Sequence, residues 1–544
     1  MPAPYYITTP IYYVNDRPHL GHCYTTLLAD AAARFQRLLT PDDRSVFFLT
    51  GTDEHADKVV SSAAAHELSP QAWADRNALE FRAAFDFMGC AYDDFIRTTE
   101  ARHTEKVVGY IRELMARGDV YLGDYQGWYD ETQEEYLTET AAREADFKSP
   151  VTGRPLVRRA EKNYFFNLPR YQERLLAHIG ANPGFIAPEA RRNEVLGRLR
   201  EGLQAVPISR AVTADPGSRW GIRMPDDPGH RIYVWIDALF NYLTAVDTPE
   251  RAGYWPARVH LIAKDILWFH AVIWPCLLMA LDRPLPGMVY THSYWVREGR
   301  KMSKSLGNFV TLEVLKAYAA RYGLDAVRWY LLVHGPLGVT DADFAHGRFV
   351  EAYNADLANG IGNCSSRVTA MIQKYFEGAV PAPPESGLVT GAPASVDWRA
   401  TCARAVAAAE AAAAQMDLAG CLRAGTDLVS AIDRYIGETR PFGLAKAMAA
   451  GGPTPAQAGL QHQLATILYN CAEALRIAAI LLSPAMPGSM GRLLARLSVT
   501  LDQRVPLAEL AAFDGPAALR PGTRVLAGEP LFARADPAEA APAG

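Results

Sequence analysis

The spacing of apolar and polar positions in the first third of the chain predicts strands and helices in alternation. Residues 5–11 form a short apolar run rich in β-formers, and residues 20–39 carry apolar side chains at helical spacing. A second apolar run at 45–49 (SVFFL) and a further helical pattern at 56–66 follow. Strand–helix–strand–helix order is typical of a doubly wound parallel sheet, the Rossmann-like α/β fold, which is the class we expect.

The pattern changes near residue 118, where charged, tyrosine and turn residues replace the apolar blocks up to about residue 229. This stretch predicts an inserted, partly β (α+β) domain. The α/β pattern then resumes, with predicted strands at 232–236 and 259–263 and a predicted helix at 265–281. The sheet domain is therefore expected to be split in the sequence by the insert.

From about residue 349 the chain becomes helical and rich in alanine, as in the run AVAAAEAAAAQM. A Pro-, Gly- and Ser-rich linker interrupts it at 381–395, and the closing ADPAEAAPAG is expected to be a disordered tail. The predicted domains are the first half of the sheet domain at 1–117, the insert at 118–229, the second half at 230–296, a loop and connecting region at 297–348, and an α-helical bundle at 349–544.

The composition is typical of a globular protein with more than one domain. A length of 544 residues allows two or three domains, and 49% hydrophobic with 21% charged residues is ordinary for a globular chain. The net charge of -5 gives no global sign of a nucleic-acid binder, so such a partner would be held by local groups. The seven cysteines contain no C-x-x-C pair, which fits a reducing cytosol.

The chain shows no segment that predicts a membrane protein. Its first residues, MPAPYYITTP, have neither the basic region nor the apolar region of a signal peptide. The most apolar later stretch, 267–281, is too short to span a bilayer and predicts a buried helix. We therefore expect a cytoplasmic protein without a membrane partner.

The segment ITTPIYYVNDRPHLGHCYTT carries the first chemical motif. It places His19 and His22 in the first turn of the predicted helix at 20–39, where backbone N–H groups and the helix dipole favour anions. Gly21 between them has no side chain, so a ligand can approach the backbone closely. This turn can hold phosphates through charge-assisted hydrogen bonds. Taken alone, an H-x-x-H pair more often consists of two surface residues at a helix start.

The second motif is RKMSKSLGN at 300–308, which follows a predicted strand. Arg300, Lys301 and Lys304 lie in a polar loop that ends at a glycine. A mobile loop of this kind can bring its lysines onto a pyrophosphate as negative charge develops. Taken alone, the motif also fits a solvated basic turn.

Together and in this order, HLGH and KMSKS resemble the paired motifs of the class I aminoacyl-tRNA synthetases. Within that class, the chain is similar to the methionyl-tRNA synthetases in ITTPIYYVN, FLTGTDEHADK, RIYVWIDALFNYLTA and KDILWFHAVIWP, and the likeness extends to about residue 500. The resemblance implies a ligase that uses ATP with Mg²⁺ to activate L-methionine and transfers it to tRNA(Met), initiator tRNA included.

The resemblance also assigns roles to residues. Those implied to act in catalysis are His19, His22, Lys301 and Lys304. Those implied to bind ATP are His19, Gly21, His22, Asp265, Lys301, Ser303 and Lys304. Those implied to bind methionine are Ile11, Tyr13, Asp53, Trp235, Ala238, Tyr242, His270 and Trp274, with the carboxylate of Asp53 on the ammonium group. Aromatic walls suit a polarizable thioether, and a carboxylate suits an ammonium ion.

Three residues of the helical domain match anticodon-binding positions of the same family. Asn363 and Arg367 are four apart, so they share one face of a helix and offer donors and acceptors to base edges. Phe442 stands where relatives have tryptophan. A phenylalanine can stack on an exposed base, but with less area than tryptophan. The alternative is that Phe442 is a core residue after the turn at Pro441.

The chain departs from many relatives in its insert, which contains no cysteine and therefore cannot form their zinc knuckle. We expect no structural zinc and no other resident metal. No appended C-terminal domain is recognisable, so we expect a monomer. Two alternatives are a small nucleotidylyltransferase with an H-x-G-H helix start and a non-catalytic tRNA-binding paralogue. The helical domain argues against the first, and the intact histidines and lysines argue against the second.

Overall fold

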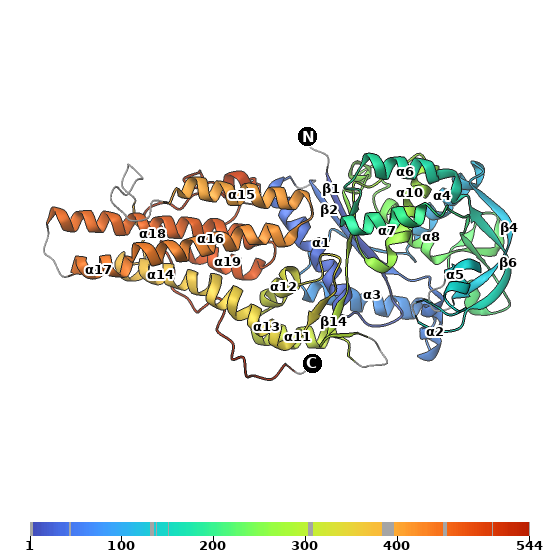
Figure 1. The fold of residues 1–544 in the computed structure, drawn as a ribbon, viewed down its shortest axis with the longest axis horizontal. Helices are drawn as coiled ribbons and strands as arrows, with labels where there is room; N and C mark the ends of the chain where they lie inside the picture. Colours follow the sequence, from blue (N-terminus) through green and yellow to red (C-terminus); the bar gives the residue numbers. More distant parts are fainter. Residues whose placement is uncertain are drawn as a thin grey trace.

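The computed structural model describes residues 4–42, 45–130, 135–137, 139–150, 152–302, 308–382, 396–449, 454–502 and 504–542. The chain is elongated, with an α/β body at one end and a long helical bundle at the other (Figure 1). The first helix, α1 (Leu20–Leu39), lies where the two parts meet.

A six-stranded sheet with the order β3-β2-β1-β12-β13-β7 forms the centre of the α/β body, and every neighbouring pair is parallel. The strands are β1 (Tyr5–Tyr13), β2 (Val46–Asp53), β3 (Asp94–Arg97), β7 (Ile186–Ala187), β12 (Val259–Ala263) and β13 (Val289–His292). The strand order reverses between β1 and β12. In an open parallel sheet, ligands bind outside the carboxyl ends of the strands at such a switch point.

Helices pack against this sheet, as the strand–helix alternation predicts, with α1 on β1, β2 and β12 and α3 on β2. The helices of the α/β body are α1, α2 (Asp57–Ala65), α3 (Pro70–Phe87), α4 (Ala101–Ala116), α8 (Val234–Leu239), α9 (Asn241–Thr244), η3 (Ala252–Tyr254), η4 (Lys264–Ile266), the π-helical η5 (Phe269–Ile273) and α10 (Trp274–Ala280). The strands predicted at 5–11, 45–49 and 259–263 and the helix predicted at 20–39 are confirmed.

The strand predicted at 232–236 is wrong, because β11 ends at Ile232 and a short helix, α8, begins at Val234. Val234, Ile236 and Ala238 are all buried. A short run that is buried on every side has no exposed face, so the spacing of its apolar residues cannot distinguish a strand from a helix.

The insert contains an antiparallel sheet of order β5-β4-β6-β8 and a smaller sheet of order β10-β11-β9. Its elements are β4 (Val120–Asp130), β5 (Glu135–Leu137), α5 (Glu139–Glu144), β6 (Val157–Phe166), η1 (Leu168–Tyr171), α6 (Gln172–Ala181), β7, α7 (Glu189–Leu199), β8 (Val206–Pro207), β9 (Ser209–Ala211), η2 (Pro216–Arg219), β10 (Arg223–Met224) and β11 (Asp227–Ile232). Because β7 pairs with β13, the stretch predicted as the insert also supplies an edge strand of the central sheet.

A small sheet and a set of helices follow the α/β body. They are β14 (Trp295–Arg297), β15 (Arg300–Lys301), α11 (Leu312–Tyr322), α12 (Leu324–Val333), β16 (Ala342–Phe344), α13 (His346–Ala352), the π-helical η6 (Tyr353–Gly362), α14 (Asn363–Tyr375), α15 (Trp398–Ala414), α16 (Leu418–Thr439), α17 (Pro441–Ala449), α18 (Pro455–Leu482), α19 (Pro487–Arg496) and α20 (Leu507–Leu510). In the described part of the chain, α18 alone is long and apolar enough to cross a membrane, but 94% of its most apolar window is buried. It is the core helix of the bundle.

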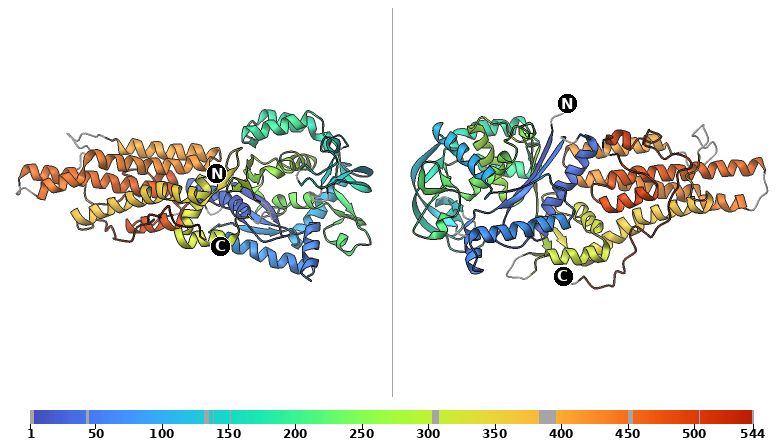
Figure 2. Two further views of the ribbon diagram at one scale, coloured as in Figure 1. Left: turned by 60° about the horizontal axis from the view of Figure 1, so that its bottom comes forward. Right: turned by 180° about the vertical axis from the view of Figure 1, so that it is seen from behind.

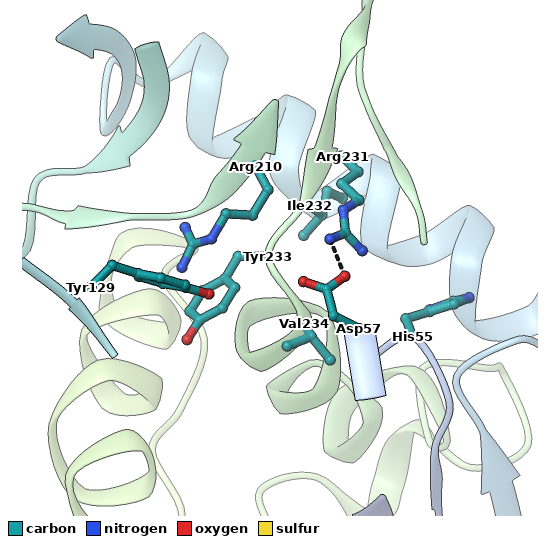
Figure 3. A pocket seen from close by; sticks show the side chains of 8 residues that line it. All are labelled: His55, Asp57, Tyr129, Arg210, Arg231, Ile232, Tyr233 and Val234. Carbon is teal, nitrogen blue, oxygen red and sulfur yellow. Dashed lines mark hydrogen bonds and ion pairs between the residues drawn. The ribbon is translucent and has the colours of Figure 1, made fainter. Parts of the chain in front are cut away.

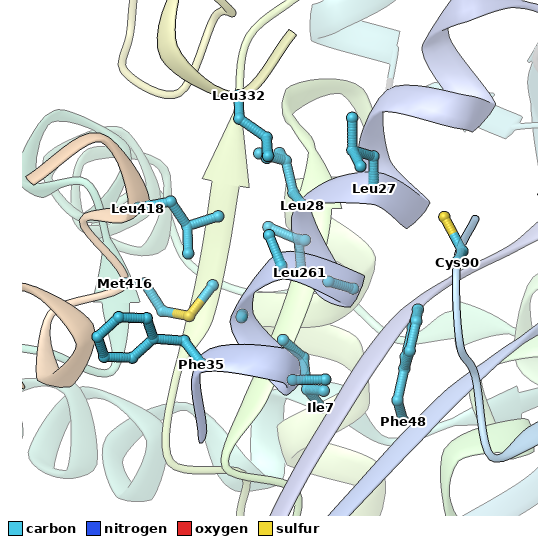
Figure 4. Close-up of a cluster of buried hydrophobic side chains, with 14 of the residues drawn as sticks. Ile7, Leu27, Leu28, Phe35, Phe48, Cys90, Leu261, Leu332, Met416 and Leu418 are labelled. Carbon is cyan, nitrogen blue, oxygen red and sulfur yellow. The ribbon is translucent and has the colours of Figure 1, made fainter. Parts of the chain in front are cut away.

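The α/β body and the bundle share one buried apolar core. α1 packs its Phe35 into the cluster that contains Ile7 and Leu261 of the sheet, and Met416 and Leu418 enter the same cluster from the bundle (Figure 4). The sheet, α1 and the bundle are therefore continuous in packing.

The C-terminal segment runs back along the bundle to the α/β body (Figure 2). The hydroxyl of Tyr353 donates to the carbonyl of Ala533 at 2.7 Å, and Arg321 Nη1 donates to the carbonyl of Ala540 at 2.9 Å. Arg321 also forms an ion pair with Glu539. The composition predicts a disordered tail, but the structure shows ordered contacts up to Ala540. The reason is that side chains of η6 and α11 donate hydrogen bonds to backbone carbonyls of this segment.

Candidate active site

Several of the residues predicted to act in the site lie at the carboxyl edge of the central sheet. β1 and β2 end side by side, with Tyr13 in register with Asp53. Asp53 is 2% exposed, and Tyr13 is half-buried beside it. The fold thus places an aromatic ring and a carboxylate next to each other at the switch point.

His19 and His22 form the first turn of α1 in a fixed arrangement. His19 is the N-cap, and its Nδ1 accepts a hydrogen bond from the N–H of Gly21 at 3.0 Å. Nδ1 of His22 accepts from the N–H of His19 at 3.3 Å. The two rings stack with centroids 3.9 Å apart and 28° between their planes. A Cβ on Gly21 would lie 3.0 Å from Cε1 of His19, so glycine leaves room for this ring position.

These hydrogen bonds fix the chemistry that the two rings offer to a ligand. Since each Nδ1 accepts a backbone N–H, the proton of each neutral ring is on Nε2, which makes it a donor. Burial lowers the pKa of His22 well below 6.5, and the neighbouring His19 lowers it further. The turn therefore presents imidazole N–H donors at a helix N-terminus, a suitable arrangement for phosphate oxygens.

The segment that follows the KMSKS loop is attached directly to this turn. The N–H of Leu20 donates to the carbonyl of Val310 at 3.0 Å, and His19 forms a β-bridge with Thr311. The ring centroid of Phe309 lies 5.0 Å from that of His19. Sequence reasoning missed Phe309, although its place directly after RKMSKSLGN was a signal.

Only part of the KMSKS motif is described. Lys301 is exposed on β15, whose hairpin with β14 leads into the loop. Ser303 and Lys304 lie outside the described residues. The structure thus brings the segment after the loop to α1 and does not describe these two predicted ligands.

Aromatic rings form a wall beside Tyr13. Its ring lies 5.8 Å from that of Trp235 at 73°, and Trp235 stacks on Phe269 with centroids 4.1 Å apart. Ala238 follows one helical turn after Trp235 on α8 and is buried, and Ile11 is half-buried on β1. This wall is apolar and polarizable, as a thioether site requires.

Tyr242 and His270, two further residues predicted to bind methionine, are joined by one short hydrogen bond. His270 Nδ1 lies 2.9 Å from the carbonyl of Ile266, which can only accept, so Nδ1 carries the proton. The Tyr242 hydroxyl therefore donates to Nε2 of His270, at 2.7 Å. Burial lowers the pKa of His270 to about 4, which keeps the ring neutral at physiological pH.

Trp274 lies deeper than the other predicted pocket residues. It is fully buried, and its indole N–H donates to Nε2 of His260 at 3.2 Å. His260 Nδ1 in turn lies 2.7 Å from the hydroxyl of Thr8. Trp274 therefore supports the wall from behind through β1 and β12.

A buried histidine–aspartate network beneath α8 was not predicted. Asp237 is 1% exposed, and its carboxylate accepts from His55 at 2.6 Å and from His103 at 2.7 Å. Burial alone would raise the pKa of Asp237, but the two imidazoles outweigh it and the pKa is lowered. The signal in the sequence was a charged residue inside the apolar run between Trp235 and Ala238.

A pocket between the α/β body and the insert opens next to this network (Figure 3). Its lining residues are His55, Asp57, Tyr129, Arg210, Arg231, Ile232, Tyr233 and Val234. The guanidinium carbon of Arg210 lies 3.9 Å from the ring centroid of Tyr233, and Arg231 forms an ion pair with Asp57. Arg210 thus brings a positive charge from the insert next to the start of α8, which sequence reasoning also missed.

Asp265 lies at the open side of the site, directly after β12. Solvent reaches its side chain, yet the surrounding protein desolvates the carboxylate enough to raise its pKa, against the effect of the Tyr294 hydroxyl. Lys264 beside it pairs with Asp341 at 2.7 Å. Asp265 is therefore an accessible acceptor at the carboxyl edge of the sheet.

The three predicted anticodon residues lie in the bundle, away from this edge. Asn363 is exposed on α14, and Nη1 of Arg367 one turn later donates to Asp433 of α16 at 2.9 Å. Phe442 is 50% exposed on α17, which marks the distal end of the bundle (Figure 1). Half of the ring is open to solvent, so the alternative of a core residue is wrong.

In the described ranges, no group of three or more His, Cys, Asp or Glu side chains is placed to hold a metal ion. The zinc-free insert remains a prediction.

The fold and this site together define the class of protein. A parallel sheet whose first strand leads into a histidine-bearing helix start, bridged to the flank of a lysine loop, is the architecture of a class I tRNA synthetase. The sequence profile described as "tRNA synthetases class I (M)" matches residues 5–145 and 145–369 of the chain.

Comparison with individual relatives shows to which family within this class the chain belongs. The methionine–tRNA ligase of Caldanaerobacter subterraneus subsp. tengcongensis is 41% identical over 541 residues, which cover 98% of this chain and 80% of that protein. The methionine–tRNA ligase of Rhizobium meliloti is 40% identical over 98% of both chains. The structure of Mycobacterium tuberculosis methionyl-tRNA synthetase in complex with methionyl-adenylate matches with a TM-score of 0.83 and 36% identity, over 98% of this chain and 100% of that one. The chain belongs to the methionyl-tRNA synthetases.

Proposed function

We propose that the chain joins L-methionine to tRNA(Met) in two steps at the carboxyl edge of the central sheet. The methionine carboxylate attacks the α-phosphorus of ATP, a new P–O bond forms, and pyrophosphate leaves with the electrons of the broken P–O bond. The terminal ribose hydroxyl of tRNA then attacks the carbonyl carbon of the adenylate and releases AMP. The observation that carries the proposal is the stacked pair His19 and His22, bridged to the flank of the lysine loop.

The first step needs positioning and charge stabilisation rather than a base, because the attacking carboxylate is already ionised. His19 and His22 donate from Nε2 to phosphate oxygens, and Gly21 lets the nucleotide approach the turn. Lys301, Ser303 and Lys304 act on the leaving pyrophosphate, where stabilisation of developing charge lowers the barrier. ATP would bind as its Mg²⁺ complex, in which the metal would offset part of the charge of the phosphates.

The aromatic wall holds the methionine side chain. Ile11, Tyr13 and Trp235 contact the thioether, and Ala238 leaves room for it. The carboxylate of Asp53 takes the ammonium group. Tyr242, His270 and Trp274 keep the wall rigid and uncharged, so it accepts a thioether in preference to a charged side chain. Asp265 accepts from the ribose of ATP.

The bundle binds the anticodon arm of tRNA(Met), elongator and initiator alike. Asn363 and Arg367 offer hydrogen bonds to base edges, and Phe442 stacks on a base. We further propose that the chain acts as a monomer in the cytoplasm, where its tRNA is found.

The test of this function is amino-acid-dependent ATP–pyrophosphate exchange with each of the common amino acids. Methionine alone should support fast exchange, and tRNA(Met) should be charged. Exchange that is supported better by leucine, isoleucine or valine would contradict the assignment of the pocket.

A further inference from the structure

One buried side chain, Arg328 of α12, joins three other parts of the chain. Arg328 is 0% exposed, and its Nη2 donates at 2.7 Å to Asp30 of α1, which is also fully buried. Its Nη1 donates to the carbonyl of Met88 at the end of α3, at 2.8 Å. Its Nε donates to the carbonyl of Ala485, in the turn between α18 and α19, at 2.8 Å. The planar guanidinium therefore fixes the relative orientation of these segments.

The segments that meet at Arg328 lead to opposite ends of the molecule. α1 carries His19 and His22 at its start and Asp30 near its middle. α18 ends three residues before Ala485, and its other end lies next to α17 at the distal end of the bundle (Figure 1). A helix of 28 residues is about 42 Å long, so α18 is a rigid connection over that distance.

Apolar contacts also join α1 to the bundle. Phe35 of α1 enters the cluster that contains Met416 and Leu418 (Figure 4). Apolar burial stabilises an interface but prescribes no direction, whereas hydrogen bonds from one planar group prescribe an orientation. Arg328 therefore sets the angle at which the bundle is held against α1.

We propose that Arg328 is a positioning residue for tRNA charging, because it keeps α1 and the bundle in the one orientation that delivers the tRNA 3′ end to the adenylate. This inference rests on the proposed binding of the anticodon arm at the distal end of the bundle. Adenylate formation occurs within the α/β body and does not need this orientation. Transfer needs both ends of the tRNA in place at once, and a misplacement of about 1 Å can lower a rate about a hundredfold.

The test compares full-length wild type with Arg328→Lys, which keeps a positive charge near Asp30 but carries its donors on a single nitrogen. Three rates are measured: pyrophosphate exchange, charging of tRNA(Met), and charging of an acceptor-arm minihelix that cannot reach the bundle. We expect kcat for tRNA(Met) charging to fall about ten- to a hundredfold, while exchange and minihelix charging stay within about twofold of wild type.

Arg476→Lys is the matched control. Arg476 is also fully buried, pairs with Glu473 and donates to the carbonyl of Leu510 at 2.5 Å, but these partners lie within the helical domain, on α18 and α20. This variant should lower the melting temperature as Arg328→Lys does and leave the ratio of tRNA charging to exchange unchanged.

Two further variants keep the outcomes separable. The double variant Arg328→Met with Asp30→Asn removes both buried charges together, so it should fold and should still show the selective loss of tRNA charging.

Two outcomes would overturn the proposal. One is an equal loss of minihelix charging and tRNA charging in Arg328→Lys, and the other is the same selective loss of tRNA charging in Arg476→Lys. Phe442→Ala, measured in parallel, tests the distal site alone. An unchanged tRNA KM for this variant would reject anticodon binding at that site, and the comparison of tRNA with minihelix charging for Arg328→Lys would remain valid.

Discussion

Individual side chains in this molecule gain their chemistry from the hydrogen bonds that their immediate neighbours impose. His270 is an example, because its Nδ1–H donates to the carbonyl of Ile266 and leaves Nε2 as the acceptor for the Tyr242 hydroxyl. The same ring in water would exchange tautomers freely. Burial in the wall also removes its charge, which is what a pocket for an uncharged thioether needs.

The lowered pKa of His270 predicts how stability depends on pH. Its pKa is about 4 in the folded protein and about 6.5 in an unfolded chain, so the unfolded state binds the proton more tightly. The stabilising effect of the neutral ring is present above pH 6.5 and is lost as pH falls from 6.5 to 4, by about 3 kcal/mol. Denaturant unfolding at several pH values should give a shallower slope in this window for His270→Gln than for wild type. The substitution of an exposed histidine, His66→Gln, is the control. Equal slopes for wild type and His270→Gln would contradict the assignment of a neutral buried ring.

Phe442 allows a test of tRNA recognition that is separate from catalysis. Stacking on a base is typically worth about 1–3 kcal/mol, so Phe442→Ala should lower charging efficiency roughly five- to a hundredfold. Pyrophosphate exchange and melting temperature should stay at wild-type values, because half of the ring is exposed. Phe442→Trp should charge as well as wild type or slightly better.

A matched control for Phe442→Ala is Leu526→Ala, which truncates another exposed apolar side chain of the same domain, 52% exposed. A large fall in melting temperature with an unchanged tRNA KM in Phe442→Ala would reject the stacking role.

Elements with a clear pattern could be predicted from the sequence, whereas contacts between distant elements could not. β1, α1, β2 and β12 have the apolar spacing of strands and an amphipathic helix, and the structure has all four. α8 was expected as a strand because burial on all sides removes the helical spacing. His55 and Asp237 are 182 positions apart, so no local pattern links them. Likewise, the position of Phe309 on His19 depends on the β-bridge between His19 and Thr311 at the start of α11.

The attachment of the KMSKS flank to α1 predicts a catalytic effect for Phe309. Phe309→Ala removes the ring that supports His19 and should lower the rate of adenylate formation about tenfold, since a small displacement of a phosphate ligand is costly. The KM for methionine should be nearly unchanged. Stopped-flow measurement of adenylate formation tests this, with Phe309→Leu as the variant that retains apolar packing. A rate for Phe309→Ala equal to that of wild type would show that His19 needs no such support.

At the scale of the whole molecule, the insert is expected to fold without metal. Purified protein should contain far less than one zinc per chain, and a chelator should leave its melting temperature and activity unchanged. Elemental analysis measures the zinc content, and calorimetry on the same sample measures the melting temperature. Stoichiometric zinc that survives purification without added metal would contradict it. Where the structure describes the insert, aromatic packing such as the stacking of Phe166 on Tyr171, 5.7 Å apart, stabilises it instead.

The pairing of β7 with β13 has a consequence for any attempt to shorten this enzyme. A chain that joined residue 117 directly to residue 230 would lose β7 and leave β13 as an open edge of the central sheet. The backbone N–H and C=O groups on that side of β13 would then be available to the edge of a second molecule, which is a known route to aggregation. The insert therefore cannot be removed as a self-contained module, and a minimal version of the enzyme would need a substitute strand at this edge.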